Sequence, residues 1–258
     1  MIVRKHTILQ RLKDVIIKND LLGYRRLDIY QDSEMFHFSI DSMLLADFVR
    51  IKKGTKKILD LGTGNAAIPL FLSLKTSAEI HGIEIQEAVY NLGVRSVKEN
   101  NLESQIQLHL GDMKEAPQLF KNQAFDIVIS NPPFFKYKPS SVINKNEYLT
   151  IARHEIKITL EEIIQLANKL LKNSGSFYLI HRPERLTDVL IALRENDLEP
   201  KRLKFVYPKQ NSKPNHILIE AMKNTNHSNL EILAPLVIYD EDGKWTEDTL
   251  KIYNYGRD

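Results

Sequence analysis

The sequence predicts an α/β fold: a mostly parallel, twisted sheet with helices on both faces, ending in an antiparallel hairpin. Two patterns favour this class. Short apolar segments alternate with amphipathic helical segments along most of the chain, as in parallel sheets whose crossover connections are helical. The last two strand-like segments then follow one another with no helix between them, which is typical of an antiparallel pair.

Five segments are predicted to be strands because they are short, apolar and rich in Ile, Val or Leu. They are residues 56–62, 79–85, 106–112, 125–130 and 176–181. Four segments have apolar residues at helical spacing or follow a strand directly. They are residues 66–75, 86–100, 160–172 and 184–197. Residues 201–207 and 216–222 are predicted to form the closing hairpin, joined by the loop 208–215.

Composition limits the class of protein. The chain has 258 residues, 43% of them hydrophobic and 27% charged, which suits one large domain with additions. We expect a basic N-terminal extension at residues 1–30 and a single domain at 31–258. No apolar stretch of about 18 residues and no secretory signal are present, so we expect a cytoplasmic protein without a membrane partner. Nothing in the sequence indicates an obligate protein partner.

Metal and thiol chemistry are not expected. The chain has no cysteine, which excludes disulfides, thiolate zinc sites, iron–sulfur clusters and a cysteine nucleophile. Its eight histidines show no spacing typical of metal ligands, so we predict no metal site.

The first motif, Gly62-Thr63-Gly64-Asn65-Ala66-Ala67, follows the first predicted strand of the sheet. It fits a dinucleotide fingerprint, and Glu84 ends the next strand at the distance expected for a ribose contact, so an NAD oxidoreductase is one interpretation. Asp60 argues against it, because a carboxylate at the strand tip would repel a pyrophosphate. S-adenosylmethionine has no phosphate and carries an ammonium and a sulfonium, which favour an acidic neighbour.

Two further residues fit the same cofactor. Asp112 follows the third predicted strand and could accept from the adenine amine, while Met113 could lie against the ring. With Asp60 and Glu84, three acidic residues then lie at successive strand ends, and Gly62 and Gly64 would allow the backbone to approach the cofactor. The alternative is a tight strand–helix turn with capping acids.

The second motif, Asn131-Pro132-Pro133-Phe134, follows the apolar strand at 125–130. Two prolines fix φ and remove two donors, which makes an extended, rigid loop. The side-chain oxygen of Asn131 and the carbonyl of Pro132 could accept the two N–H bonds of a planar amine and direct its lone pair toward a methyl group. Phe134 could stack on the acceptor ring. The alternative is a proline turn with a packed phenylalanine.

With both motifs, the chain resembles the Rossmann-like class I methyltransferases whose fourth motif is Asn-Pro-Pro-Phe/Tyr. Residues 31–46, Ala152-Arg153-His154-Glu155 and residues 203–208 are similar to the bacterial tRNA(Val) adenine-N6-methyltransferase family. The resemblance covers about residues 20–255. It implies an S-adenosyl-L-methionine cofactor, a tRNA substrate and N6 methylation of an adenine in the anticodon region.

The resemblance also implies roles for individual residues. Cofactor contacts are expected from Asp60, Gly62, Gly64, Glu84, Asp112, Met113 and Asn131; acceptor contacts are expected from Asn131, Pro132 and Phe134. Phe38 and Asp41 match an element that lies over the cofactor in such enzymes. Their alternative role is to start a helix at residues 42–50, with a capping Ser39 or Asp41 and an apolar contact from Phe38.

The acceptor remains open between three classes. Phe134 stands where we would expect tyrosine in adenine-N6 relatives, and guanine-N2 methyltransferases of ribosomal RNA can carry phenylalanine there. A protein glutamine-N5 methyltransferase and a noncatalytic RNA-binding module are further alternatives. Basic residues in 1–30 and in the long loop 134–158 could contact RNA phosphates, among them Arg153 with its neighbour His154. A salt bridge from Arg153 to Glu155 or Glu161 is an alternative.

Overall fold

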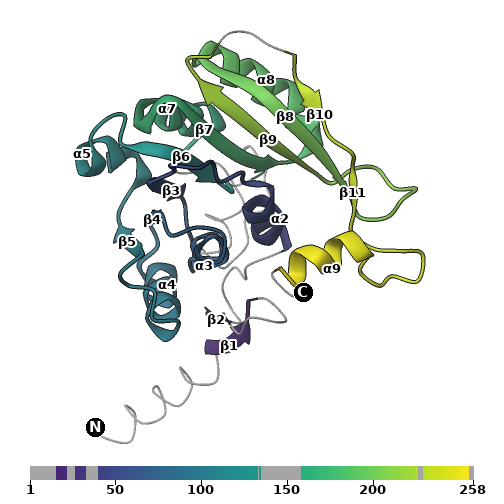
Figure 1. Cartoon of the computed structure of the whole chain (residues 1–258), viewed down its shortest axis with the longest axis horizontal. Helices are drawn as coiled ribbons and strands as arrows, with labels where there is room; N and C mark the ends of the chain where they lie inside the picture. The colour runs from purple at the N-terminus through teal and green to yellow at the C-terminus, as the bar shows by residue number, and fades with distance from the viewer. Residues whose placement is uncertain are drawn as a thin grey trace, which may run out of the picture.

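A large, mostly parallel sheet forms the centre of the protein in the computed structural model (Figure 1). The structure describes residues 16–21, 27–32, 40–132, 134, 158–225 and 229–255. The strand order is β10-β8-β9-β7-β6-β3-β4-β5, with β11 also paired to β8. Strands β3 to β7 run parallel, and β9 lies antiparallel between β7 and β8. The predicted fold class is confirmed.

The strands follow the predicted order, with additions at both ends of the chain. The main sheet contains β3 Lys57–Leu61, β4 Glu79–Glu84, β5 Ile106–Leu110, β6 Phe125–Ser130, β7 Leu171–His181, β8 Leu198–Tyr207, β9 His216–Lys223, β10 Glu231–Ile232 and β11 Leu236–Val237. A separate two-stranded sheet contains β1 Ile16–Asp20 and β2 Asp28–Asp32.

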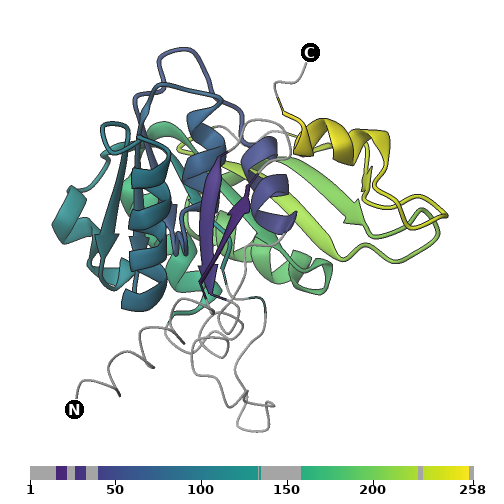
Figure 2. The ribbon, with the colours of Figure 1, turned by 90° about the horizontal axis from the view of Figure 1, so that it is seen from below.

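The helices connect these strands and lie on both sides of the sheet. They are α2 Ile40–Phe48, α3 Ala67–Ser73, α4 Glu87–Glu99, α5 Ala116–Phe120, α7 Leu160–Leu170, α8 Leu186–Glu195 and α9 Glu247–Tyr253, with short 3-10 turns η1 Met113–Glu115 and η2 Pro183–Arg185. Figure 2 shows α2, α3 and α4 together along one side of the sheet.

Alternating side chains divide the core into two layers. In β3, Ile58 belongs to the layer under α2 and α3, whereas Leu59 belongs to the layer under α7 and α8. This alternation is the period of two that a strand imposes, so both faces of the sheet are apolar and covered. The strands that carry the two motifs are therefore rigidly held in the middle of the sheet.

The helix preceding β7 ends earlier than the predicted 160–172. A capping box starts α7, because Thr159 accepts from the backbone of Glu162 and the Glu162 carboxylate accepts from Thr159. Leu171 is already extended, with φ −71° and ψ 138°, and pairs with Phe125 of β6. This pairing with a neighbouring strand extends β7 well beyond the predicted 176–181.

The hairpin β1–β2 packs on α4. The backbone N–H of Tyr30 donates to the Ser96 hydroxyl at 2.9 Å, and Asn100 both donates to and accepts from the backbone of Asp28. Lys18 is held by Asp28 and Glu99 at 2.9 and 2.6 Å. This lysine therefore neutralises protein carboxylates. The other Lys and Arg residues of the extension lie outside the described residues.

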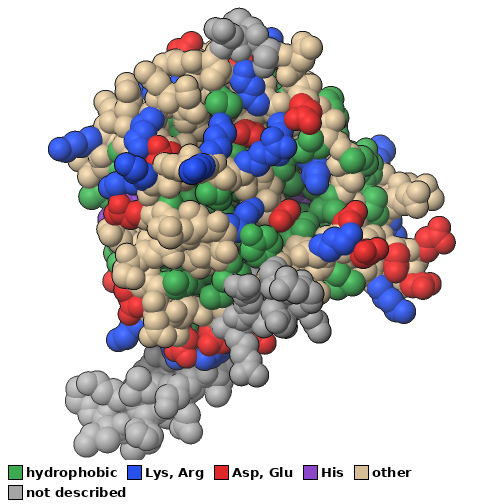
Figure 3. All heavy atoms as spheres, viewed as in Figure 1, with side chains coloured by type: hydrophobic (Ala, Val, Ile, Leu, Met, Phe, Trp, Pro, Cys, Tyr) green, Lys and Arg blue, Asp and Glu red, His purple; other side chains and the backbone are tan. Residues whose placement is uncertain are grey.

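Acidic and basic side chains are mixed on the face of the molecule that Figure 3 shows. In Figure 3, Lys and Arg side chains gather over α7, β6 and β7, with acidic side chains among them. Lys172 of β7 bonds to Asp126 at 2.7 Å, and Asp126 also accepts from the backbone N–H groups of Lys56 and Lys57. Within the described ranges, no helix has the length and apolar character needed to cross a membrane.

Candidate active site

The two motif loops leave neighbouring strands at the same level. Strands β3 and β6 are parallel, and their register pairs Leu61 with Ser130. The next residues are Gly62 and Asn131, the first residues of the two loops. The buried Ser130 hydroxyl donates to the Leu61 carbonyl at 3.0 Å and joins the two strand ends. Both loops therefore lie at the carboxyl edge of the sheet, where open α/β sheets bind ligands.

The glycine loop needs left-handed backbone at several positions. Gly62 and Gly64 have φ of +76° and +59°, and Ala66 has φ of 69° just before α3. The N–H groups of Gly62 and Thr63 both donate to the Ile83 carbonyl at 3.0 Å, which binds the loop to β4. A side chain at Gly62 would come 3.3 Å from the Met113 methyl group. Glycine is therefore required here by conformation and by space.

Asp60 is buried in the sheet beneath this loop. Its side chain has no exposed surface, and neither carboxylate oxygen has a hydrogen-bond partner among the described residues. Burial raises the pKa of Asp60 to about 7, and the negative charge of Glu84 adds to this shift. The nearby Thr63 side chain opposes the shift, although it makes no well-aligned hydrogen bond to Asp60. An unpaired buried carboxylate is costly, so this position favours a cationic ligand group.

The Glu84 carboxylate accepts hydrogen bonds from the glycine loop and from the residue that precedes α4. One carboxylate oxygen accepts from the Gly64 N–H at 3.0 Å and the other from the Gln86 N–H at 2.9 Å. Burial raises the pKa of Glu84, and these backbone bonds oppose the shift. Because each carboxylate oxygen has more than one acceptor position, the residue retains capacity for ribose hydroxyls.

Asp112 and Met113 follow β5 at the same edge. The predicted strand 106–112 ends at Leu110, since Asp112 caps the turn η1 by accepting from the Lys114 N–H at 2.9 Å. Met113 is half-buried and lies beside Gly62. The structure thus brings Asp60, the glycine loop and Met113 together.

Asn131 is oriented by a contact that the sequence did not reveal. Its side-chain nitrogen donates to the Ser42 hydroxyl at 3.4 Å, a long hydrogen bond that crosses from β6 to the first turn of α2. This use of the amide nitrogen leaves the amide oxygen as the acceptor that an amine requires. The following residue, Pro132, is buried.

Phe134 contacts two histidines. Its ring centroid is 5.6 Å from that of His181, the last residue of β7, and 5.5 Å from that of His216, the first residue of β9. The Nε2 atom of His216 is 3.5 Å from the Asp41 carboxylate. Burial lowers the pKa of His216, and the charge of Asp41 opposes this. Asp41 thus links α2 to the aromatic group around Phe134.

Sequence reasoning missed the roles of Ser42, His181 and His216. No local pattern marks them, because each contact joins segments far apart in the chain. Asp41 lies in the first turn of α2, which begins at Ile40 rather than at the expected residue 42. Phe38, Arg153 and His154 lie outside the described residues.

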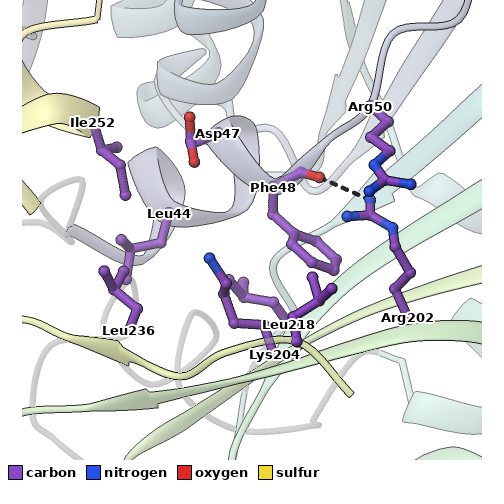
Figure 4. Close-up of a pocket in the computed structure, with 10 residues that line it drawn as sticks. Leu44, Asp47, Phe48, Arg50, Arg202, Lys204, Leu218, Leu236 and Ile252 are labelled. Atoms are coloured by element: carbon purple, nitrogen blue, oxygen red, sulfur yellow. Dashed lines mark hydrogen bonds between the residues drawn. The ribbon is translucent and has the colours of Figure 1, made fainter. Parts of the chain in front are cut away.

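A buried ion pair holds the other end of α2. Arg202 bonds to Glu220 at 2.5 Å and to the Phe48 carbonyl at 3.2 Å, and Glu220 also accepts from the Tyr178 hydroxyl at 2.9 Å. Figure 4 shows Phe48 and Arg202 beside a pocket lined by α2, β8 and β9, with the Asp47 side chain above and the Lys204 side chain below in this view. This network fixes α2, whose first turn supplies Asp41 and Ser42 to the site.

The arrangement is suited to a cationic ligand beside a planar acceptor. Two buried carboxylates, Asp60 and Glu84, lie at the edge, and the oxygens of Asp60 lack partners among the described residues. The ammonium of S-adenosylmethionine matches this charge, whereas a pyrophosphate opposes it. The residues present therefore fit that cofactor, and the dinucleotide alternative is disfavoured.

Comparison with known proteins agrees with the fold. The profile of the family described as "Methyltransferase domain" matches residues 52–233. A tRNA1(Val) (adenine(37)-N6)-methyltransferase of Porphyromonas gingivalis is 30% identical over 207 residues, covering 78% of this chain and 80% of the relative. A protein of the same name from Cytophaga hutchinsonii is 22% identical, covering 92% of this chain and 97% of the relative.

Solved structures share the fold. A protein described as a predicted O-methyltransferase, from Agrobacterium tumefaciens, has a TM-score of 0.65 at 20% identity, over 83% of this chain and 95% of that one. The geranyl diphosphate C-methyltransferase of Streptomyces coelicolor, solved with S-adenosyl-L-homocysteine, has a TM-score of 0.52 at 13% identity, over 70% of this chain and 78% of that one. The chain belongs to the methyltransferase domain family and is a relative of the tRNA1(Val) (adenine(37)-N6)-methyltransferases.

Proposed function

We propose that this enzyme transfers a methyl group from S-adenosyl-L-methionine to the N6 amine of an adenine in tRNA, at position 37 of a valine tRNA. The observation that carries the proposal is the register of the parallel strands β3 and β6, which brings the glycine loop and Asn131 to one edge of the sheet. The names of the relatives support the choice of adenine and tRNA. A tRNA substrate agrees with the cytoplasmic location predicted from the sequence.

The cofactor would be held mainly by residues at the ends of three strands, β3, β4 and β5. Asp60 would face its ammonium group directly or through water, Glu84 would accept from the ribose hydroxyls, and Asp112 and Met113 would contact the adenine. Gly62 and Gly64 give the backbone room to approach. When bound, the cofactor supplies an electrophilic methyl group on a sulfonium. Phe38, from the segment that precedes α2, and Asp41, from the first turn of α2, would cover the cofactor.

The acceptor amine would be held by Asn131 and Pro132. The Asn131 side-chain oxygen and the Pro132 carbonyl would each accept one N–H bond of the amine, which shifts its lone pair out of conjugation and toward the methyl group. Ser42 supports this by holding the Asn131 amide nitrogen. Phe134 would stack on the base. The rate acceleration comes from positioning the amine, so no strong general base is required.

The target base must leave its stack before it can reach this edge. Extrusion costs about a few kcal/mol and is least costly in a single-stranded loop such as an anticodon loop. We propose that the basic N-terminal extension, residues 1–30, and the loop 134–158 contact the RNA, while residues 31–258 form the methyltransferase domain. Lys18 is paired with Asp28 and Glu99, so the other basic residues of the extension would supply the positive charge that contacts RNA phosphates.

The test is to identify the methylated product. The purified protein is incubated with labelled S-adenosylmethionine and total RNA from a strain that lacks the gene, and the RNA is digested to nucleosides. N6-methyladenosine in the tRNA fraction supports the proposal. N2-methylguanosine in ribosomal RNA would instead identify guanine as the acceptor. Labelling of a protein glutamine and not of RNA would show that the substrate is a protein.

A further inference from the structure

His181 is a buried polar residue next to the proposed acceptor site. It is the last residue of β7 and has no exposed surface. Its ring meets the Phe134 ring edge to face, with centroids 5.6 Å apart and an angle of 61° between the planes. A histidine in this position touches the residue on which the target base would stack.

One hydrogen bond defines the tautomer of His181. Its Nδ1 atom accepts from the backbone N–H of Arg182 at 2.8 Å. Burial, with the nearby charge of Arg185, lowers the pKa of the ring to about 4, so the imidazole is neutral at physiological pH. In a neutral ring with an accepting Nδ1, the proton lies on Nε2.

That Nε2–H group lacks a partner. It is buried and makes no hydrogen bond to any of the residues that the structure describes. Buried donors are rarely left unpaired, because the missing bond costs free energy. A donor that is unpaired beside Phe134 fits a ligand that brings its own acceptor.

We infer that His181 positions the target base by donating its Nε2–H to a ring nitrogen beside the reacting amine. The inference rests on the proposed function. In adenine, the N6 amine is flanked by N1 and N7, and both are acceptors. In guanine, the N2 amine is flanked by the N1–H donor, which would oppose the histidine donor, and by N3, which would accept it. His181 therefore suits adenine through either neighbouring nitrogen but guanine only through N3, and it fixes the rotation of the base on Phe134.

The test combines variants of the enzyme with analogues of the base. His181→Asn keeps an acceptor for the Arg182 N–H but has no donor where Nε2 lies, whereas His181→Gln can place an amide N–H there. Each is assayed on an anticodon stem-loop that carries adenosine, 1-deazaadenosine or 7-deazaadenosine at the target position. Binding of S-adenosylhomocysteine and thermal unfolding are measured for each variant as controls.

The expected result is a coupled loss. H181N lowers kcat/KM on adenosine about 10- to 100-fold, since a buried hydrogen bond to the base is lost. H181Q recovers much of it, and both variants bind S-adenosylhomocysteine like the wild type. One deaza analogue lowers the wild-type rate by a similar factor but does not lower the H181N rate further; which analogue does so identifies the ring nitrogen.

Two outcomes would overturn the inference. In one, H181N keeps wild-type activity; in the other, both deaza substitutions affect H181N as strongly as the wild type. If H181N does not fold, the wild type and H181Q are compared on the same analogues. A donor at the Nε2 position predicts that both enzymes lose activity with the same analogue. A wild-type enzyme that never methylates adenine in RNA contradicts the proposed function instead.

Discussion

Asp60→Asn should make the protein more stable at neutral pH. The pKa of Asp60 is about 7 in the folded protein against an ordinary 3.8. Between these values the unfolded chain has released the proton and the folded protein still holds it, so stability falls as the pH rises from about 4 to 7. A difference of about three pH units corresponds to about 4 kcal/mol at most. The amide of the D60N variant is neutral at every pH, so the substitution removes this decline.

The assay is urea unfolding of both proteins at pH 4, 5, 6, 7 and 8. The advantage of D60N should be near zero at pH 4, grow to about pH 7 and then level off. Removing this carboxylate should also weaken binding of S-adenosylhomocysteine, since its ammonium loses a partner. A difference in stability between the two proteins that stays constant from pH 4 to 8 would refute the burial argument.

Asp126→Asn is a control with the opposite sign. Partial burial acts to raise the pKa of Asp126, but hydrogen bonds from Lys172 and from the backbone of Lys56 and Lys57 outweigh it, and the net shift is downward. A carboxylate whose pKa is lower in the folded than in the unfolded protein stabilises the fold at a pH above its unfolded-state pKa. This stabilisation is lost as the pH falls through its folded-state pKa. D126N should therefore be less stable than the wild type at pH 7, and the deficit should shrink toward low pH.

Three more predictions concern the site and its support. Gly62→Ala should cost about 1–3 kcal/mol of stability in urea unfolding, because of its positive φ and the nearby Met113 methyl, and should weaken S-adenosylhomocysteine binding. Arg202→Met should cost about 3–5 kcal/mol by leaving the buried Glu220 carboxylate without its opposite charge, and the double variant with Glu220→Leu should recover part of this; a double variant as unstable as R202M would contradict it. Calorimetric affinity for S-adenosylhomocysteine should rise with pH to about 7 and then level off as Asp60 ionises; an affinity independent of pH would contradict this role.

The central part of the fold could be predicted because its signals are local. Apolar runs of strand length and helical spacing locate β3 to β9 and the helices α3, α4, α7 and α8, with errors of a few residues at the ends, whereas the short helix α5 was not predicted. The exceptions lie where tertiary pairing decides. Leu171 leaves α7 to pair with Phe125, and β10 and β11 are two-residue strands that form only along β8. The hairpin β1–β2 is fixed by contacts with α4 rather than by its own sequence.

The site was predictable where residues follow strand ends. Asp60, Glu84 and Asn131 could be placed at one edge, because parallel strands bring their carboxyl ends together. The contacts of Ser42 and His181 could not be predicted, since they depend on where α2 and β7 meet the loops. His181 in particular is the last residue of an apolar strand, and its unpaired Nε2 is visible only in three dimensions.

The most direct test of the account separates cofactor binding from methyl transfer in Asn131→Ala. Calorimetry gives the affinity for S-adenosylhomocysteine, and single-turnover methylation of the valine tRNA gives the rate. If the Asn131 amide oxygen holds the amine, N131A should bind the cofactor product within about threefold of the wild type and lose about 100-fold or more in rate. A variant that keeps a near-wild-type rate would contradict the assignment of this loop as the acceptor site.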